Sequence, residues 1–428
     1  MHPAPAPSPP PVSTRLPASF CRMAGFFAVM ALLWLPHGRR FDWTRWHLSA
    51  DQNPAVAEAR AWWSGRLDLP ARLHDTAVDP RTGRVFNVYP PLLTLVSFLM
   101  LAPQTDPGSV EVLPPALVWA ALAWPVPLVG FAAFAALAPR VRWTVFWTAA
   151  WLLGTALLPV AKLARDGQVY HLNHLLSQIG LLLIAADLLA WRRHWPAWVG
   201  LLVAAWSRQL TIFYAVPVLL AAWRNERPKP LAPGATPGRL GKNGRARNLI
   251  GAIVACALVA ALPAALNRAR FGSFLETGYR HVFADRDDDF ARSARSGLFA
   301  LHHIPRNAYY MNAAIPDISW QSGRPRLHPS VDGASIWFTT PLLAVVWLRV
   351  RRWWRLAPHR SLMLTSCLVA LVLCGYHATG SVQPGYYRFA LDFVPVWLAV
   401  GAATPAGGRW RTISIAAAGW GIAYFALL

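Results

Sequence analysis

The sequence predicts an all-α membrane protein built as a bundle of transmembrane helices. Its 428 residues are 55% hydrophobic and only 14% charged, whereas soluble domains are about 25% charged. The apolar residues gather in repeated runs, and a helix needs about 20 of them to cross a bilayer. The 23 Trp and 10 Tyr are typical of aromatic belts at membrane surfaces.

The N-terminal segment leads directly into the first predicted span. Residues 1–18 are rich in proline, and we expect them to be disordered because such a composition forms no packed core. The first transmembrane helix is predicted over 19–37. Arg15 and Arg22 lie at its start, so the positive-inside rule places the N-terminus in the cytoplasm. We predict that residues 19–428 form one transmembrane domain.

Residues 38–111 are predicted to be the first outer loop. Within this loop, 88–102 is apolar but short for a span. If it crossed, 103–111 would be cytoplasmic although this segment carries acidic residues and no Lys or Arg, against the positive-inside rule. We therefore predict that 88–102 is an interfacial or re-entrant helix with prolines at its start.

Basic residues between the apolar runs orient the rest of the chain. A single span over 195–223 would place the strongly basic loop 224–247 outside, so we prefer a tight hairpin over 195–223 with Arg208 at its outer tip. The bundle then has about eleven spans and a second outer loop at 267–334. The other predicted spans are 112–138, 143–161, 175–191, 248–266, 335–348, 361–377, 389–404 and 412–428.

Composition and motifs exclude several classes of protein. The net charge of +22 does not indicate nucleic-acid binding, because the basic residues lie between apolar spans, where topology explains them. The chain has no Walker loop, no dinucleotide-binding glycine motif and no serine-nucleophile elbow. The cysteines lack metal-ligand spacing and are interpreted as small apolar residues within the spans: Cys21, Cys256, Cys367 and Cys374.

Asp51 is the leading candidate for a catalytic base. It precedes a predicted helix that starts at Asn53 and Pro54 and ends at Gly65, with an apolar face that we expect on the membrane surface. The helix dipole would keep the carboxylate ionised, so that it deprotonates an acceptor hydroxyl or holds a divalent cation. The alternative is a structural hydrogen bond near the helix N-cap.

Other carboxylates offer weaker alternatives. Asp42 and Asp75 are rivals to Asp51, and His74 with Asp75 is either an acid–carboxylate pair or a local turn. Residues 287–289 either bind a cation or form a solvated acidic turn, since no calcium-loop spacing follows. Asp187 lies inside an apolar span, and local pairing with nearby arginines is favoured over a proton path.

Three basic side chains are candidates for the phosphate of a lipid: Arg208, Arg388 and Lys162. Arg208 and Arg388 lie where such a phosphate would sit, and Arg binds phosphate through two parallel hydrogen bonds. The alternative for each is ordinary snorkelling to the interface. Lys162 and His171 lie in the outer segment 162–174. His171 and His174 would share a helix face and could bind a metal, but no third ligand lies nearby, so a polar outer rim is the favoured interpretation.

Several motifs of the chain follow one another in a family-like order. The early outer-loop acid is followed by G-R-L-D-L (65–69) and G-R-V-F-N-V-Y-P-P-L (83–92). This pattern, over most of the chain, resembles the bacterial GT-C type membrane glycosyltransferases, the multi-spanning relatives of protein O-mannosyltransferases and of arabinosyl and mannosyl transferases. Later motifs agree: G-S-F-L-E-T-G-Y (272–279), G-L-F (297–299), R-N-A-Y-Y (306–310) and Y-R-F-A-L-D-F-V-P (387–395).

The resemblance implies a GT-C-like fold with the active site on two outer loops. It implies transfer of a sugar from polyprenyl phosphate to a glycan, lipid or protein acceptor on the outer face of the cytoplasmic membrane. The family's catalytic acid best matches Asp51, but Gln52 stands where many members have a second acid, which weakens a role for a divalent cation. The predicted substrate-binding residues are Arg388, Arg208, Lys162, His171, Gln383 and Tyr89.

Three other functions use the same architecture. A transporter or flippase would place polar residues at mid-membrane within paired repeats, and the chain shows no internal repeat. A lipid-linked polysaccharide ligase would depend on the outer arginines more than on Asp51. An inactive GT-C homologue that only binds lipid is the third alternative.

Overall fold

The chain folds mainly into helices. The computed structural model describes residues 48–164, 167–224, 242–321, 324–380, 385–404 and 406–428. Helices make up 66% and strands 5%, which confirms the all-α class. The predicted first span over 19–37 lies outside the described residues, as do Asp42 and Gln383.

Four of the described helices are long and apolar enough to cross a membrane: Pro115–Leu137, Val169–Trp191, Gly244–Phe271 and Ala357–Cys374. A fifth candidate is the pair Val141–Leu153 and Leu157–Ala164, whose axes are bent by 61°. The predicted membrane protein is therefore supported, and the count of about eleven spans stays a prediction. The helix at 92–101 has ten residues and rises about 15 Å, which agrees with an interfacial or re-entrant segment.

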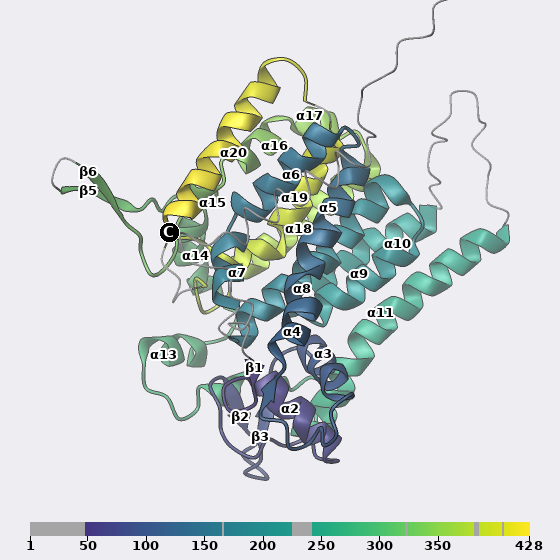
Figure 1. Ribbon diagram of the computed structural model, residues 1–428, viewed down its shortest axis with the longest axis vertical. Helices are drawn as coiled ribbons and strands as arrows, with labels where there is room; N and C mark the ends of the chain where they lie inside the picture. The colour runs from purple at the N-terminus through teal and green to yellow at the C-terminus, as the bar shows by residue number, and fades with distance from the viewer. Residues whose placement is uncertain (1–47, 165–166, 225–241, 322–323, 381–384, 405) are drawn as a thin grey trace, which may run out of the picture.

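The first polar segment forms a small layer at one end of the bundle (Figure 1). Strand β1 pairs antiparallel with β4, and β2 pairs antiparallel with β3 in a hairpin. Its elements are β1 (Leu48–Ser49), α2 (Pro54–Trp63), β2 (Thr76–Val78), β3 (Val85–Asn87), α3 (Leu92–Leu101) and β4 (Val112–Leu113).

The bundle follows, with α8 at its centre. Helix α8 is buried over most of its length between α5, α7, α9 and α19. The π-helical turn η2 joins α4 to α5, and the π-helical turn η3 follows the end of α8. The elements are α4 (Pro115–Val118), η2 (Trp119–Ala123), α5 (Pro125–Leu137), α6 (Val141–Leu153), α7 (Leu157–Ala164), α8 (Val169–Ala186), η3 (Asp187–Trp191), α9 (Trp195–Ala205), η4 (Gln209–Tyr214), α10 (Ala215–Arg224) and α11 (Lys242–Phe271).

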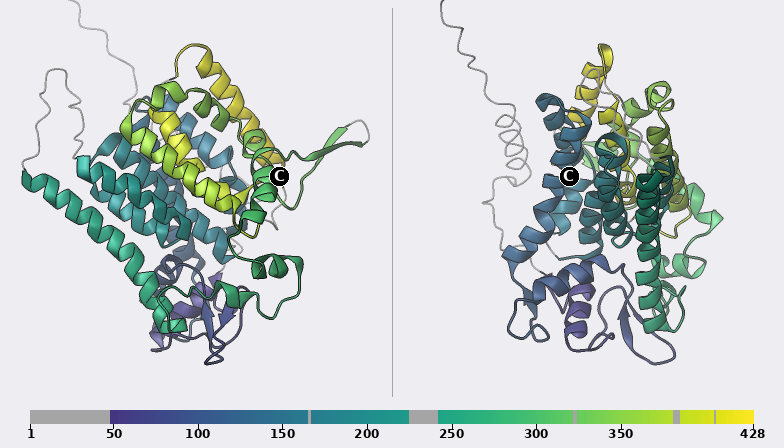
Figure 2. Two further views of the ribbon diagram at one scale, coloured as in Figure 1. Left: turned by 180° about the vertical axis from the view of Figure 1, so that it is seen from behind. Right: turned by 90° about the vertical axis from the view of Figure 1, so that its right-hand side faces the viewer.

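The second polar segment returns to the same end and then sends out a hairpin. Helices α12 and α13 lie beside the first polar segment, whereas β5 and β6 project away from the bundle (Figures 1 and 2). Six further α-helices of the described chain, α15 to α20, close the bundle after it. The elements are α12 (Tyr279–Val282), α13 (Asp289–Arg295), η5 (Leu301–His303), α14 (Ile304–Asn312), β5 (Asp317–Gln321), β6 (Arg324–His328), α15 (Ile336–Thr339), α16 (Leu342–Leu348), α17 (Val350–Trp353), α18 (Ala357–Cys374), η6 (Arg388–Asp392), α19 (Val394–Ala403) and α20 (Arg409–Leu427).

Helix α2 corrects one prediction. We expected its apolar face on the membrane surface, but α2 is buried against α3 inside the protein. Glu58 shows the reason, because its fully buried carboxylate accepts hydrogen bonds from Asn87 and Thr94, both at 2.8 Å, and pairs with Arg270 at the end of α11. This polar network ties α2, β3, α3 and α11 together, and a carboxylate held in this way is incompatible with a lipid-facing helix.

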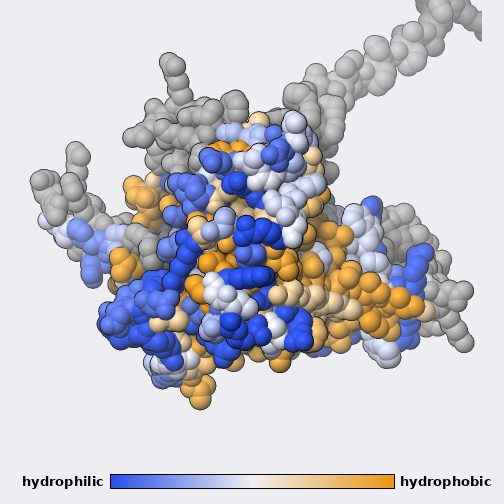
Figure 3. Space-filling view, turned by 90° about the horizontal axis from the view of Figure 1, so that it is seen from below, coloured by the Kyte–Doolittle hydropathy of each residue, from blue (hydrophilic) through white to orange (hydrophobic). Residues whose placement is uncertain are grey.

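The end of the bundle covered by residues 48–113 and 272–300 is called the loop end. Figure 3 views it directly and shows hydrophilic residues clustered over it, with apolar residues gathered to one side. Helix α11 contributes exposed apolar side chains, among them Ile250 and Ile253, and is the least buried of the candidate spans. The two polar segments thus meet over one end of an apolar bundle.

Candidate functional site

Asp75 lies in a tight turn just before β2. Its φ of 58° is in the left-handed region, which is uncommon for a residue other than glycine and occurs at functional sites. Carboxylate oxygen Oδ2 accepts a 2.7 Å hydrogen bond from the Tyr89 hydroxyl and lies 3.2 Å from Nδ1 of His74. Burial alone would raise the pKa of Asp75, but the hydrogen bonds from His74 and Tyr89 bring it below its usual value. The carboxylate is therefore ionised at neutral pH.

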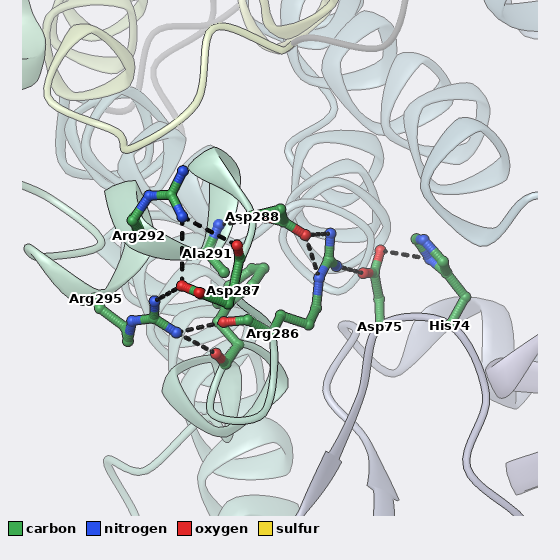
Figure 4. A network of polar contacts seen from close by, with 9 residues as sticks. His74, Asp75, Arg286, Asp287, Asp288, Ala291, Arg292 and Arg295 are labelled. Atoms are coloured by element: carbon green, nitrogen blue, oxygen red, sulfur yellow. Dashed lines mark hydrogen bonds and ion pairs between the residues drawn. The ribbon is translucent and has the colours of Figure 1, made fainter.

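The turn before α13 contacts this carboxylate from the second polar segment. Figure 4 shows Arg286 lying between Asp75 and Asp288, with N–O distances of 3.9 and 2.7 Å. A second ion pair, between Arg72 and Asp285 at 2.7 Å, joins the same two segments. Two segments about 200 residues apart in sequence thus meet at Asp75.

A cavity of about 200 Å³ lies next to Tyr89, where the two polar segments cover the bundle. Its wall is partly apolar and partly polar, as expected for a site that binds a ligand with a lipid part and a polar part. It is lined by Tyr89, Pro90, Asn173, Ser207, Arg208, Gln209, Leu210, Thr277, Tyr279, Leu298, Phe299, Leu373, Tyr376 and Phe389.

Asn173 is an unsatisfied polar group in this wall. The side chain is 1% exposed, and neither its Oδ1 nor its Nδ2 has a hydrogen-bond partner among the described residues. A buried amide without partners costs free energy that a ligand recovers by bonding to it. Asn173 is therefore available to bind the hydroxyl groups of a substrate in the cavity.

Arg208 is held in the wall by Asp392. Its Nε and Nη2 donate to the two carboxylate oxygens of Asp392 at 3.1 and 3.0 Å, in the bidentate geometry typical of strong Arg–carboxylate pairs. The guanidinium carbon also lies 5.4 Å from the centre of the Phe389 ring. Because Asp392 is completely buried, this pair is a fixed part of the wall with little net charge.

Arg388 supplies a positive charge that no carboxylate among the described residues pairs with. Its guanidinium carbon lies 4.7 Å from the ring centre of Tyr170 and 5.2 Å from that of Phe389. Among the described residues no carboxylate pairs with Arg388, and its Nε has no hydrogen-bond partner. Burial and the nearby Arg208 lower the pKa of Arg388, but a guanidinium stays protonated in proteins. The arrangement favours binding of an anion.

Two tyrosines complete the polar part of the cavity. Burial raises the pKa of Tyr376 to about 12 and also raises that of Tyr279. Both hydroxyls are therefore neutral at physiological pH and able to donate hydrogen bonds.

The structure brings together only some of the predicted site residues. Tyr89 and Arg208 line the cavity, and Arg388 packs on Phe389 in its wall. His171 is buried in α8 and packs against Tyr170, with 4.3 Å between ring centres. Lys162 is half-buried at the end of α7 and is not among the lining residues. Gln383 lies outside the described residues.

Asp51 and Asp187 lie apart from the cavity lining. Asp51 is exposed in the turn before α2, and Asn53 caps that helix by accepting a 2.9 Å hydrogen bond from the Ala55 N–H. Asp187 accepts a 2.8 Å hydrogen bond from the backbone N–H of Arg193.

Sequence reasoning passed over Asn173, Tyr279, Tyr376 and Asp392. The signal for Asp392 was its place in an otherwise apolar stretch four residues after Arg388. No comparable signal marked the tyrosines. Within the described parts of the chain, no three His, Cys, Asp or Glu side chains are grouped so as to hold a metal ion.

Comparison of the chain with protein-family models, with curated proteins and with solved structures gave no match.

Proposed function

We propose that the protein is a membrane glycosyltransferase that moves a sugar from polyprenyl phosphate to an acceptor hydroxyl at the loop end. One observation carries the proposal: an ionised carboxylate, Asp75, contacts Tyr89 in the cavity wall, and a cation without a carboxylate partner among the described residues, Arg388, contacts Phe389 in the same wall. Tyr89 links them, since it bonds Asp75 and lies in the electric field of Arg388. A general base for the acceptor and a cation for the leaving phosphate are the two charges that this transfer requires.

Asp75 replaces Asp51 as the proposed base. Both contacts from His74 and Tyr89 go to Oδ2, and the contact of Oδ1 among the described residues is the more distant Arg286, at 3.9 Å. Oδ1 then takes the proton of the acceptor hydroxyl while the hydroxyl oxygen bonds to the anomeric carbon. The bond from that carbon to the phosphate oxygen breaks, and the polyprenyl phosphate leaves with the electron pair. Attack opposite the leaving group inverts the anomeric centre.

The remaining walls suit the other parts of the donor. Arg388 binds the phosphate, and Asn173 with the neutral hydroxyls of Tyr279 and Tyr376 binds the sugar. The apolar wall formed by Leu210, Leu298, Phe299 and Leu373 accommodates the first prenyl units. Phe299 is 51% exposed, and the prenyl chain of the donor would leave the cavity beside it and enter the lipid. The divalent cation considered for Asp51 has no part in this scheme.

The proposed location is the outer face of the cytoplasmic membrane, with the N-terminus inside. Support comes from the opposite end of the bundle, where the basic segments 139–142 and 407–411 lie. The positive-inside rule puts these segments in the cytoplasm and so puts the loop end outside.

Transfer from radiolabelled polyprenyl-phosphate sugars tests the proposal, with membranes that contain equal amounts of each variant. Asp75→Asn is expected to lower the rate at least about 100-fold, and Asp51→Asn to leave it unchanged. Asn is the appropriate replacement because it tolerates the left-handed conformation that position 75 requires. Asp75→Asn therefore removes the charge of the proposed base without adding backbone strain at position 75.

The other outcomes separate the alternatives. Loss in Asp51→Asn with activity retained in Asp75→Asn would return the role of base to Asp51. Activity that survives in Asp75→Asn but disappears in Arg388→Gln would indicate a polysaccharide ligase that uses the same lipid-linked donor. Absence of transfer by the wild type with every donor would refute the enzyme and leave lipid binding or transport.

A further inference from the structure

A second cavity lies at the end of the bundle opposite the loop end. It has a volume of about 310 Å³ and lies between α5, α6, α19 and α20. Helix α19 runs from the Arg388–Asp392 turn beside the first cavity to Ala403 beside the second. Its ten residues rise about 15 Å, so the two cavities are separate sites.

Two arginines meet an apolar wall in this cavity. Arg140 lies just before α6 and Arg411 in the first turn of α20, and both line the cavity with Trp143 and Trp147. The guanidinium carbon of Arg411 lies 5.3 Å from the ring centre of Trp143. Its buried Nε has no hydrogen-bond partner among the described residues. Arg411 thus has a buried donor that no described residue satisfies.

The charge around the cavity is of one sign. Its described lining residues include no carboxylate. A third arginine, Arg349, is buried beside it and donates to the carbonyl oxygen of Thr404, which lines the cavity. The N-terminal ends of α6 and α20 also lie here, and helix N-termini carry partial positive charge. The cavity therefore favours an anion strongly.

Its surroundings indicate a lipid anion. Tryptophans concentrate at the level of lipid headgroups, and Trp143 and Trp147 line the cavity. Basic pockets between membrane helices bind the headgroups of anionic lipids. The wall formed by Leu137, Trp147, Gly401 and Ala402 would contact the glycerol and the first acyl carbons, which a free phosphate ion lacks.

We propose that this cavity binds the phosphate headgroup of an anionic phospholipid, with Arg140 and Arg411 on the phosphate oxygens and Trp143 beside the glycerol. The site is independent of the proposed transfer reaction. It ties the helix pair α5–α6 to α19–α20 through a bound lipid, at the junction where the separate basic segments 139–142 and 407–411 meet.

Native mass spectrometry of the full chain in detergent, with added phosphatidylglycerol, tests the proposal. Arg411→Gln and Arg140→Gln are each expected to reduce occupancy by phosphatidylglycerol about tenfold or more, since each removes charge-assisted hydrogen bonds to phosphate. Arg409→Gln is the matched control, because Arg409 lies on the same turn of α20, is exposed and does not line the cavity. It is expected to bind as the wild type does.

Two further measurements, with phosphatidylcholine and with inorganic phosphate, identify the class of ligand. Phosphatidylcholine of the same chain length is expected to bind at least about tenfold more weakly, because its net charge is zero. Inorganic phosphate in excess is expected not to displace phosphatidylglycerol, and displacement would show a phosphate-ion site and overturn the lipid assignment. Equal occupancy in Arg411→Gln, Arg140→Gln and Arg409→Gln would overturn the site itself.

A variant that keeps every charge distinguishes loss of the lipid site from loss of the folded protein. Ala406→Trp places a large ring at the half-buried rim of the cavity without touching either arginine. It is expected to lower phosphatidylglycerol occupancy as strongly as Arg411→Gln does, with an unchanged unfolding temperature in lipid-free detergent. Normal occupancy in a folded Ala406→Trp protein would show that the lipid binds elsewhere.

Discussion

The hydroxyl of Tyr89 donates a 2.7 Å hydrogen bond to the carboxylate of Asp75, whose backbone is in the left-handed region. The two residues are 14 positions apart and are joined by the β2–β3 hairpin. The hairpin register, with Thr76 opposite Asn87, brings the residue before β2 next to the segment after β3. The bond holds a charged carboxylate against Tyr89, which lines the cavity.

Tyr89→Phe is expected to move the acid limb of the pH–rate profile to higher pH. A base is active above its pKa and loses activity as the pH falls through it. The hydrogen bonds from His74 and Tyr89 lower the pKa of Asp75 against the effect of burial, so the wild type should lose activity only below the usual aspartate value of about 3.9. Without Tyr89 the pKa of Asp75 rises.

The measurement is the initial rate of transfer across the acid range. Tyr309→Phe serves as the control, since Tyr309 is 55% exposed on α14 and does not line the cavity. An acid limb that stays in place in Tyr89→Phe would contradict the assignment of Asp75.

Arg388→Gln is expected to raise the KM for the lipid-linked donor about tenfold or more, because it removes the cation that binds phosphate. Arg388→Lys should recover part of this loss, since an ammonium keeps the charge but not the bidentate geometry. The thermal stability of Arg388→Gln should be equal to or above that of the wild type, because a half-buried charge without a carboxylate partner among the described residues is costly.

Steady-state kinetics and thermal unfolding of the same preparations check both halves of this prediction. Arg84→Gln is the control, because Arg84 is exposed on the β2–β3 hairpin. A drop in stability without a change in KM would make Arg388 a structural residue.

Glu58→Gln is expected to destabilise the fold by about 3–5 kcal/mol, the usual cost of removing one partner of a buried ion pair. The amide can still accept from Asn87 and Thr94, but Arg270, only 5% exposed, is left without its carboxylate. Thermal unfolding in detergent measures the effect. The exposed Glu111, in the same polar segment, supplies the control Glu111→Gln, and equal stability of the two variants would contradict the role of the network.

Gly180→Ala is expected to destabilise the packing of α8 on α9 by about 1–3 kcal/mol. A Cβ at Gly180 would lie 2.4 Å from the carbonyl oxygen of Gly200 and from the backbone N of Ala204, so the two helices would have to separate. Gly419→Ala on α20 is the control, because a Cβ there meets nothing within 4 Å.

The same unfolding assay compares these two glycine variants. Since alanine favours a helix over glycine by up to about 1 kcal/mol, Gly419→Ala should be neutral or stabilising. A Gly180→Ala protein as stable as Gly419→Ala would show that α8 and α9 are not closely packed.

Sequence patterns are reliable where the physical cause is local. Apolar runs and their boundaries depend on neighbouring residues, so the helical class and the apolar stretches around α5, α8, α11 and α18 were predictable. The break near Arg208 and the short helix at 92–101 were predictable from charge and length. Arg208 and Arg388 also emerged as candidates, because arginines at the outer ends of apolar spans lie where a lipid phosphate would sit. Tyr89 emerged because it belongs to a motif that carries the resemblance.

The sequence by itself determined that this chain is helical, apolar and basic between its apolar runs. Only the tertiary structure showed that Asp75 contacts a residue of the cavity wall, Tyr89, because that contact depends on the turn at Asp75 and on the β2–β3 register. It also placed α2 inside the protein, since the alanines of α2 suit a protein neighbour as well as a lipid, and only the Glu58–Arg270 pair distinguishes the two. Contacts between residues far apart in sequence leave no periodic trace in either segment, and the function proposed here rests on such contacts.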